Sequence, residues 1–233
     1  MPRNSRALLL DLDDTLYPLL RFRLSGFAAV ARHLARYHAV DEAQAFRLLS
    51  SAARGPQRGR ELDLVIQRFK LDVPVAALVR VMRGHTPELR LPATTETTLR
   101  LLKPSWRLAI VTNGIPAIQK AKVAALGVEA LVDTVVYANE HGSGEGKPER
   151  EPFLEALRRL DVAPAQAIAV GDDEFADVFG AARCGLRSIQ SREWRRGPFG
   201  PVSICADAVV SRFTDVPVIA ECILPERLSL YAA

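Results

Sequence analysis

The sequence predicts an α/β fold in which a parallel sheet is flanked by helices, and three observations support this. The 233 residues are 48% hydrophobic and 25% charged, which is typical of a globular protein with a substantial core. Short, wholly apolar runs recur at 7–10, 108–111 and 167–170, and such runs are typical of strands buried on both faces of a parallel sheet. Segments with helical spacing lie between the runs, so strands and helices alternate as in βαβ units.

The core elements are predicted from these runs and from the residues that end them. The helix that follows the second run stops at Gly127, and another stops at Gly185; glycine commonly terminates helices because it adopts the left-handed conformation without strain. Pro152 precedes a further predicted helix, at 153–160. In chain order, the predicted strands are 7–10, 108–111, 132–137, 167–170 and 208–210, and the predicted helices are 115–126, 153–160 and 175–184.

A long helical segment interrupts this alternation after the first strand. Residues 19–88 contain no strand-like run. Apolar residues from Phe27 to Tyr37 recur at helical spacing, and Asp41 is a candidate N-cap for a second helix. Two more helices are expected at 62–69 and 75–82. We therefore expect a core domain formed by 1–18 and 89–233 and an inserted, all-helical domain formed by 19–88.

Composition excludes several classes of function. Lysine and arginine number 31 against 27 acidic residues, a net charge of +4 that is spread along the chain and not gathered in a basic stripe, so we expect no nucleic-acid partner. The 3 cysteines lack the spacing of a metal site and indicate reduced thiols. No apolar run reaches the roughly 18–20 residues of a membrane span, so we expect a cytoplasmic protein with no membrane partner.

Polar residues follow three of the predicted strands. Asp11 and Asp13 come after the first run, Thr112 and Asn113 after the second, and Asp172 after a later one, with Asp173 and Asp177 just beyond. In open α/β sheets, ligands bind outside the carboxyl ends of the strands. These side chains are therefore expected to face one crevice.

Repulsion between the clustered carboxylates limits which ligands this crevice can bind. Two like charges ~4 Å apart repel by about 4 kcal/mol at an effective dielectric constant of ~20, so several clustered carboxylates require protons or a cation. An all-oxygen ligand set without histidine or cysteine suits Mg²⁺, which also accepts a substrate phosphate in its shell. Lys147, in a glycine-rich loop, is the candidate for a fixed positive charge that balances the aspartates.

Four segments in this order resemble the motifs of the haloacid dehalogenase (HAD) superfamily: DLDDTLY, IVTNG, GKPEREPF and VGDDEFADVFGAARCG. The resemblance runs from about residue 7 to about residue 190. It implies a Rossmann-like, three-layer α/β/α core, and it implies that the helical insertion is the cap domain of this family.

The resemblance also implies roles for the site residues. Asp11 would be the nucleophile, which forms an aspartyl-phosphate, and Asp13 would be the general acid and base. Thr112, Asn113 and Lys147 would hold the phosphoryl group. Mg²⁺ would be bound by Asp11, Asp172 and the backbone carbonyl of Asp13. Asp173 and Asp177 would support this shell.

The expected activity is Mg²⁺-dependent hydrolysis of a small phosphorylated metabolite, with nucleoside monophosphates among the candidates. A phosphomutase shares all four motifs and stays an alternative. Dehalogenases of the superfamily lack the carboxylate at the position of Asp13, and a non-enzymatic phospho-acceptor domain lacks the long helical insertion. Candidate substrate contacts in the insertion are Arg21, Arg23, Arg32 and His33. The protein is expected to be a monomer or a homodimer.

Overall fold

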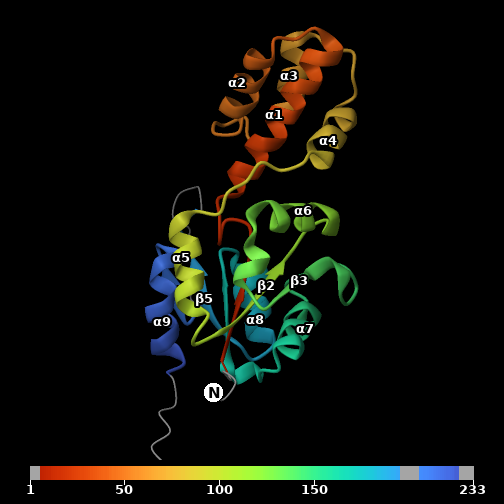
Figure 1. Ribbon diagram of the computed structural model, residues 1–233. Helices are drawn as coiled ribbons and strands as arrows, with labels where there is room; N and C mark the ends of the chain where they lie inside the picture. The colour runs from red at the N-terminus through yellow and green to blue at the C-terminus, as the bar shows by residue number, and fades with distance from the viewer. Residues whose placement is uncertain (1–5, 195–204, 226–233) are drawn as a thin grey trace, which may run out of the picture. The chain divides into compact units, whose positions relative to one another are not determined.

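A parallel sheet of six strands forms the centre of the core (Figure 1). The structure, a computed structural model, describes residues 6–194 and 205–225. The strand order is β3-β2-β1-β4-β5-β6, and every neighbouring pair is parallel. The strands are β1 (Ala7–Leu10), β2 (Arg107–Thr112), β3 (Thr134–Tyr137), β4 (Ala167–Gly171), β5 (Arg187–Ser191) and β6 (Ala208–Val210). This arrangement confirms the predicted fold class.

Strand register brings the polar residues to one edge of the sheet. Leu10 of β1 pairs with Ile110 of β2 on one side and with Val170 of β4 on the other. The three central strands therefore end at the same edge of the sheet, with β2 running on to Thr112 and β4 to Gly171, and the residues that follow them emerge close together. The backbone N–H of Asp11 donates to the Val170 carbonyl at 2.8 Å and extends the ladder by one bond.

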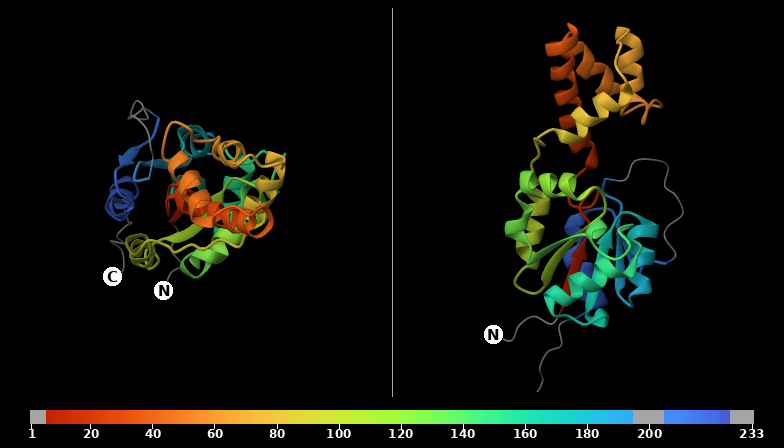
Figure 2. Two further views of the ribbon diagram at one scale, coloured as in Figure 1. Left: turned by 90° about the horizontal axis from the view of Figure 1, so that it is seen from above. Right: turned by 90° about the vertical axis from the view of Figure 1, so that its right-hand side faces the viewer.

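Helices cover both faces of the sheet (Figure 2). Leu9 and Val111 point toward helix α7 (Arg150–Leu160) and helix α8 (Gly180–Arg183), where they join one buried apolar cluster with Phe153. Alternate strand residues point to the opposite face. The right-handed crossovers expected between parallel strands put α5 (Ala93–Leu102) and α6 (Pro116–Leu126) on that face, and α9 (Val216–Ile223) packs against α5.

The predicted strands and core helices are present, and the described residues add one strand, two α-helices and several short 3-10 helices. The sequence did not predict α5, β5 or α9. Strand β5 reads Arg-Ser-Ile-Gln-Ser, yet Ser188, Gln190 and Ser191 are buried, in a strand that pairs with β4 on one side and with β6 on the other. The helix expected at 175–184 differs in type: it begins as a π-helix (Glu174–Phe179) and continues as α8.

The chain divides into two compact units: the first comprises Met1–Pro18 and Arg90–Ala233, and the second comprises Leu19–Leu89. The second unit contains α1 (Leu19–His38), α2 (Glu42–Ala52), α3 (Glu61–Phe69) and α4 (Val75–Gly84) around its own apolar cluster. Asp41 caps α2 as predicted, because its side chain accepts a hydrogen bond from the Gln44 backbone N–H. Among the described helices of both units, none combines the length and apolarity needed to cross a bilayer.

Candidate active site

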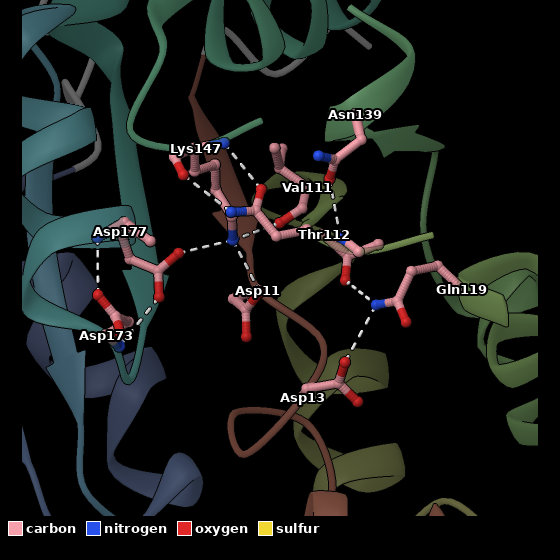
Figure 3. A network of polar contacts seen from close by, with 12 residues as sticks. Asp11, Asp13, Val111, Thr112, Gln119, Asn139, Lys147, Asp173 and Asp177 are labelled. Atoms are coloured by element: carbon pink, nitrogen blue, oxygen red, sulfur yellow. Dashed lines mark hydrogen bonds and ion pairs between the residues drawn. The ribbon is translucent and has the colours of Figure 1, made fainter. Parts of the chain in front are cut away.

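The chain turns sharply after β1 and separates Asp11 from Asp13. Asp14 has a φ of 56°, and its backbone N–H donates to the Tyr17 carbonyl at 2.9 Å. Residues two apart in a continuing strand would share one face of the sheet. The turn instead directs Asp11 toward Lys147 and Asp13 toward helix α6, so the two carboxylates have different partners (Figure 3).

Lys147 is the centre of the polar network around Asp11. Its ammonium donates to Asp11 Oδ1 at 2.7 Å, to Asp177 Oδ1 at 2.6 Å and to the Val111 carbonyl at 2.7 Å, so its three N–H donors are all engaged (Figure 3). Burial alone would lower the pKa of Lys147, but the charges of Asp11 and Asp177 outweigh burial and raise the pKa above its ordinary value. The lysine therefore stays charged.

The loop before Lys147 is held by the side chain of Asn113. The Lys147 backbone N–H donates to Asn113 Oδ1, and Asn113 Nδ2 donates to the Lys147 carbonyl, both at 2.8 Å. Gly146 has a φ of 76°, and a Cβ there would lie 2.7 Å from Asn113 Oδ1, so glycine is required for this close approach. The amide of Asn113 thus positions Lys147, and its predicted contact with phosphate stays a prediction.

Three carboxylates gather beside Lys147. Oxygen atoms of Asp11, Asp172 and Asp177 lie within 4.8 Å of one another. Burial, followed by repulsion from Asp11 and Asp177, raises the pKa of Asp172 to about 8. Burial also raises the pKa of Asp11 to about 7, although Lys147 opposes this. An all-oxygen cluster whose members resist ionising together fits a hard divalent cation.

Asp173 precedes the π-helix as its N-cap, whereas Asp177 lies within it. Asp173 caps its N-terminus: Oδ1 accepts from the backbone N–H groups of Phe175 and Ala176, at 2.9 and 2.7 Å. The backbone N–H of Asp173 in turn donates to Asp177 Oδ2 at 3.1 Å. Asp177 thus contacts Lys147 directly, whereas Asp173 acts on Asp177 through its backbone.

Within the described part of the chain, Asp13 has three side-chain partners that sequence reasoning missed. The hydroxyl of Tyr17 donates to Oδ1 at 2.6 Å, and Gln119 and Lys122 of α6 donate to Oδ2 at 3.0 and 2.7 Å. Burial, followed by the charge of Asp13, raises the pKa of Tyr17, so its hydroxyl stays protonated as a donor. The missed signal lies in helix 115–126, where Gln119 and Lys122 share the core-facing stripe with Val123.

A family model described as haloacid dehalogenase-like hydrolase matches residues 5–185. The chain belongs to the HAD-like hydrolase family. The predicted family membership and the prediction of an enzyme, a hydrolase, are both confirmed.

Relatives of this HAD-like hydrolase include named phosphatases. The chain is 30% identical over 197 residues to glyceraldehyde 3-phosphate phosphatase of Methanothermobacter thermautotrophicus, covering 79% of this chain and 84% of that protein. It is 30% identical over 200 residues to ribulose-1,5-bisphosphate 5-phosphatase of Halopiger xanaduensis, covering 78% and 83%. A solved structure of a HAD phosphatase from Thermococcus onnurineus is 25% identical, with a TM-score of 0.59 over 92% of this chain and 97% of that chain.

The candidate residues of the helical unit have local partners in this HAD-like hydrolase. Arg23 forms a mostly buried ion pair with Glu61 at 2.5 Å, which indicates a structural role. Arg32 lies 3.4 Å from Glu88 in an exposed pair, and the ring of His33 packs 4.8 Å from that of Tyr37. Arg21 is exposed on α1. Roles for these four residues in substrate binding stay predictions.

Proposed function

We infer that this protein is a Mg²⁺-dependent phosphatase that hydrolyses a small phosphorylated metabolite through an aspartyl-phosphate on Asp11. The observation that carries this proposal is the separation of two carboxylates at one sheet edge: Asp11 pairs with Lys147, and Asp13 pairs with Lys122. A nucleophile and a proton-transfer group need different surroundings at close quarters, and this arrangement supplies them.

The first step forms a bond from Asp11 to phosphorus. The bond from phosphorus to the ester oxygen breaks, and Asp13 donates a proton to that oxygen as it leaves. Lys147 holds Asp11 in place and adds positive charge beside the phosphoryl group. The hydroxyl of Thr112 accepts from Gln119 at 2.5 Å, so its own hydrogen is directed elsewhere and can be donated to a phosphoryl oxygen.

The second step returns the enzyme to its starting state. Asp13, now a carboxylate, takes a proton from water, and the water oxygen attacks phosphorus while the bond to Asp11 breaks. Asp11, Asp172 and the Asp13 carbonyl would hold Mg²⁺, and Asp177 is near enough to join them. When bound, Mg²⁺ supplies positive charge that offsets repulsion between the carboxylates and an anionic substrate.

The substrate class proposed is a small phosphorylated sugar or related metabolite. The relatives named above act on glyceraldehyde 3-phosphate and ribulose-1,5-bisphosphate, according to their names. Nucleoside monophosphates, considered from the sequence, are kept as a second class. We further propose that Leu19–Leu89 is the cap domain that selects among substrates, and that the enzyme acts in the cytoplasm on free metabolites.

Asp13 distinguishes this proposal from the alternatives. A dehalogenase of the superfamily does not use a carboxylate at this position, whereas here Asp13 is held by three donors. A phosphomutase would return the phosphoryl group to its substrate, and a phospho-acceptor domain would turn over once. Steady release of inorganic phosphate over many turnovers separates hydrolysis from both.

The experiment is a phosphate-release screen with the purified chain. Phosphorylated sugars, short phosphorylated acids and nucleoside monophosphates would be supplied with Mg²⁺ or with EDTA. We expect multiple turnovers with Mg²⁺, loss of release with EDTA, and recovery when Mg²⁺ is restored. The folded Asp11→Asn variant is the control. Release that persists in this variant, or that is equal in EDTA, would refute the proposal.

A further inference from the structure

We propose that Lys122 and Gln119, which lie outside the four motifs, are positioning residues that orient the Asp13 carboxylate for proton transfer. This inference rests on the proposed phosphatase function. It assigns a role in the reaction to one face of helix α6, and it identifies which oxygen of Asp13 exchanges the proton.

The contacts converge on one oxygen atom. Lys122 Nζ lies 2.7 Å from Asp13 Oδ2, and Gln119 Nε2 lies 3.0 Å from the same atom. Gln119 Nε2 also donates to Thr112 Oγ1, and Figure 3 shows its amide between Asp13 and Thr112. One side chain of α6 therefore links the proposed acid and base to the proposed phosphate-binding hydroxyl.

Lys122 and Gln119 are polar side chains at buried positions, where desolvation is costly. Lys122 is 4% exposed and Gln119 is 2% exposed, on a stripe of α6 that also carries the buried residues Val123 and Leu126. An apolar side chain at either position would continue the stripe without desolvating a charge or an amide. Lys120 provides the contrast: it lies on the same helix, but its side chain is 53% exposed and pairs with Glu140 at the surface.

The contacts of Asp13 occupy most of the hydrogen-bond acceptor positions on its carboxylate. An ionised carboxylate offers about four lone-pair positions, two on each oxygen. Gln119 and Lys122 fill the two on Oδ2, and Tyr17 fills one on Oδ1. Among the contacts of the described residues, one position on Oδ1 is left. The Asp13 side chain is 19% exposed, so this position can be reached, and Oδ1 is the atom that would exchange a proton with the ester oxygen and with water.

The test compares substrates that differ in their need for a proton. The leaving group of an alkyl phosphate is a strongly basic alkoxide unless its oxygen is protonated. The leaving group of p-nitrophenyl phosphate is the stable p-nitrophenolate anion. The first turnover, measured by rapid quench, isolates the step in which Asp13 acts as an acid. The variants are Lys122→Met and Lys122→Arg. Lys120→Met is the matched control because it removes the same charge from the surface of the same helix.

We expect Lys122→Met to slow the first turnover of an alkyl phosphate by about 10²-fold, within the range attributed to a positioned acid. The first turnover of p-nitrophenyl phosphate should fall by less than about threefold, since it needs no proton, and KM should change by less than about twofold. Lys122→Arg should recover part of the loss, and Lys120→Met should match the parent enzyme.

Equal losses with both substrates, or a Lys122→Met enzyme indistinguishable from Lys120→Met, would overturn the inference. If Lys122→Met does not fold, Gln119→Leu tests the same contact from its other member, with the same selective loss expected. Absence of phosphatase activity in the parent enzyme would refute the proposed function itself. If the parent enzyme is active and the Lys122→Met variant matches it on both substrates, only the positioning role is refuted.

Discussion

The carboxylate of Asp177 lies directly against the backbone of Gly171, so closely that a Cβ on this glycine would be 2.1 Å from Asp177 Oδ2. Gly171 is the last residue of β4, and Asp177 lies one turn into the π-helix that follows. The absence of a side chain lets Asp177 reach back to Lys147 at 2.6 Å. Lys147 then contacts Asp11, so the glycine acts on the proposed nucleophile through two charged side chains.

Replacing Gly171 therefore tests this chain of contacts. Gly171→Ala should displace Asp177, release Lys147 from one partner and lower phosphatase activity at least tenfold, with a loss of about 1–3 kcal/mol in the free energy of unfolding from overpacking. Phosphate release and urea denaturation measure the two effects. Gly84→Ala is the control, because a Cβ there meets nothing within 4 Å. A fully active Gly171→Ala enzyme would show that the position of Asp177 is unimportant.

Lys147→Met is expected to abolish activity and to destabilise the protein. The substitution leaves Asp11 and Asp177 buried without their common partner, and breaking a buried ion pair from one side typically costs about 3–5 kcal/mol. Lys103→Met, at an exposed lysine, should change neither quantity. Denaturation curves and turnover rates for both variants provide the comparison. Stability equal to that of the parent would contradict the central position given to Lys147.

The raised pKa values of Asp11 and Asp172 predict how stability depends on pH without metal. Both carboxyls have an ordinary pKa of 3.8, raised in the folded protein to about 7 and about 8. At pH values between the ordinary pKa and the raised pKa of each carboxyl, the folded state therefore holds more protons than the unfolded state. The contribution of these groups to the free energy of unfolding falls as pH rises through this window. We expect the melting temperature in EDTA to decrease from pH 5 to pH 8.

Magnesium and one substitution provide the controls for this prediction. Mg²⁺ binds the ionised carboxylates of the folded state, so its stabilising effect should be largest near pH 8. Asp172→Asn removes one repelling charge, and this variant should melt higher than the parent protein in EDTA at pH 8 while losing the response to Mg²⁺. A melting temperature in EDTA that rises with pH, or a full Mg²⁺ response in Asp172→Asn, would contradict this account.

The sequence predicted those elements whose residues all fit the hydrophobic pattern of a strand or a helix. The apolar run Ala7–Leu10 became the central strand at its predicted bounds, because a strand buried on both faces needs apolar residues at each position. Strand β5 carries buried serines and a buried glutamine, and α5 is rich in threonine, so neither has the pattern of its element. Their conformations depend on neighbouring strands and helices, which a local pattern does not contain.

The candidate site was predictable where a residue follows a strand end. Asp11 and Asp172 come together as the register of β1 and β4 requires, whereas Lys147 reaches Asp11 from the loop between β3 and α7. Lys122 and Gln119 could not be placed from the motifs, because they lie in the middle of a helix. The useful signal was two polar residues on an apolar stripe, and its meaning became visible only when Asp13 was found opposite them.

The most direct test of the account is to locate the phosphoryl group on the enzyme during turnover. Asp13→Asn should slow the water-dependent second step, so a phosphoenzyme should accumulate with p-nitrophenyl phosphate, whose leaving group needs no proton. Acid quench followed by peptide mass spectrometry would locate the modification. The account predicts one phosphoryl group on Asp11 and none in the Asp11→Asn, Asp13→Asn double variant. A phosphoryl group on another residue, or steady turnover by Asp13→Asn at the parental rate without a phosphoenzyme, would contradict it.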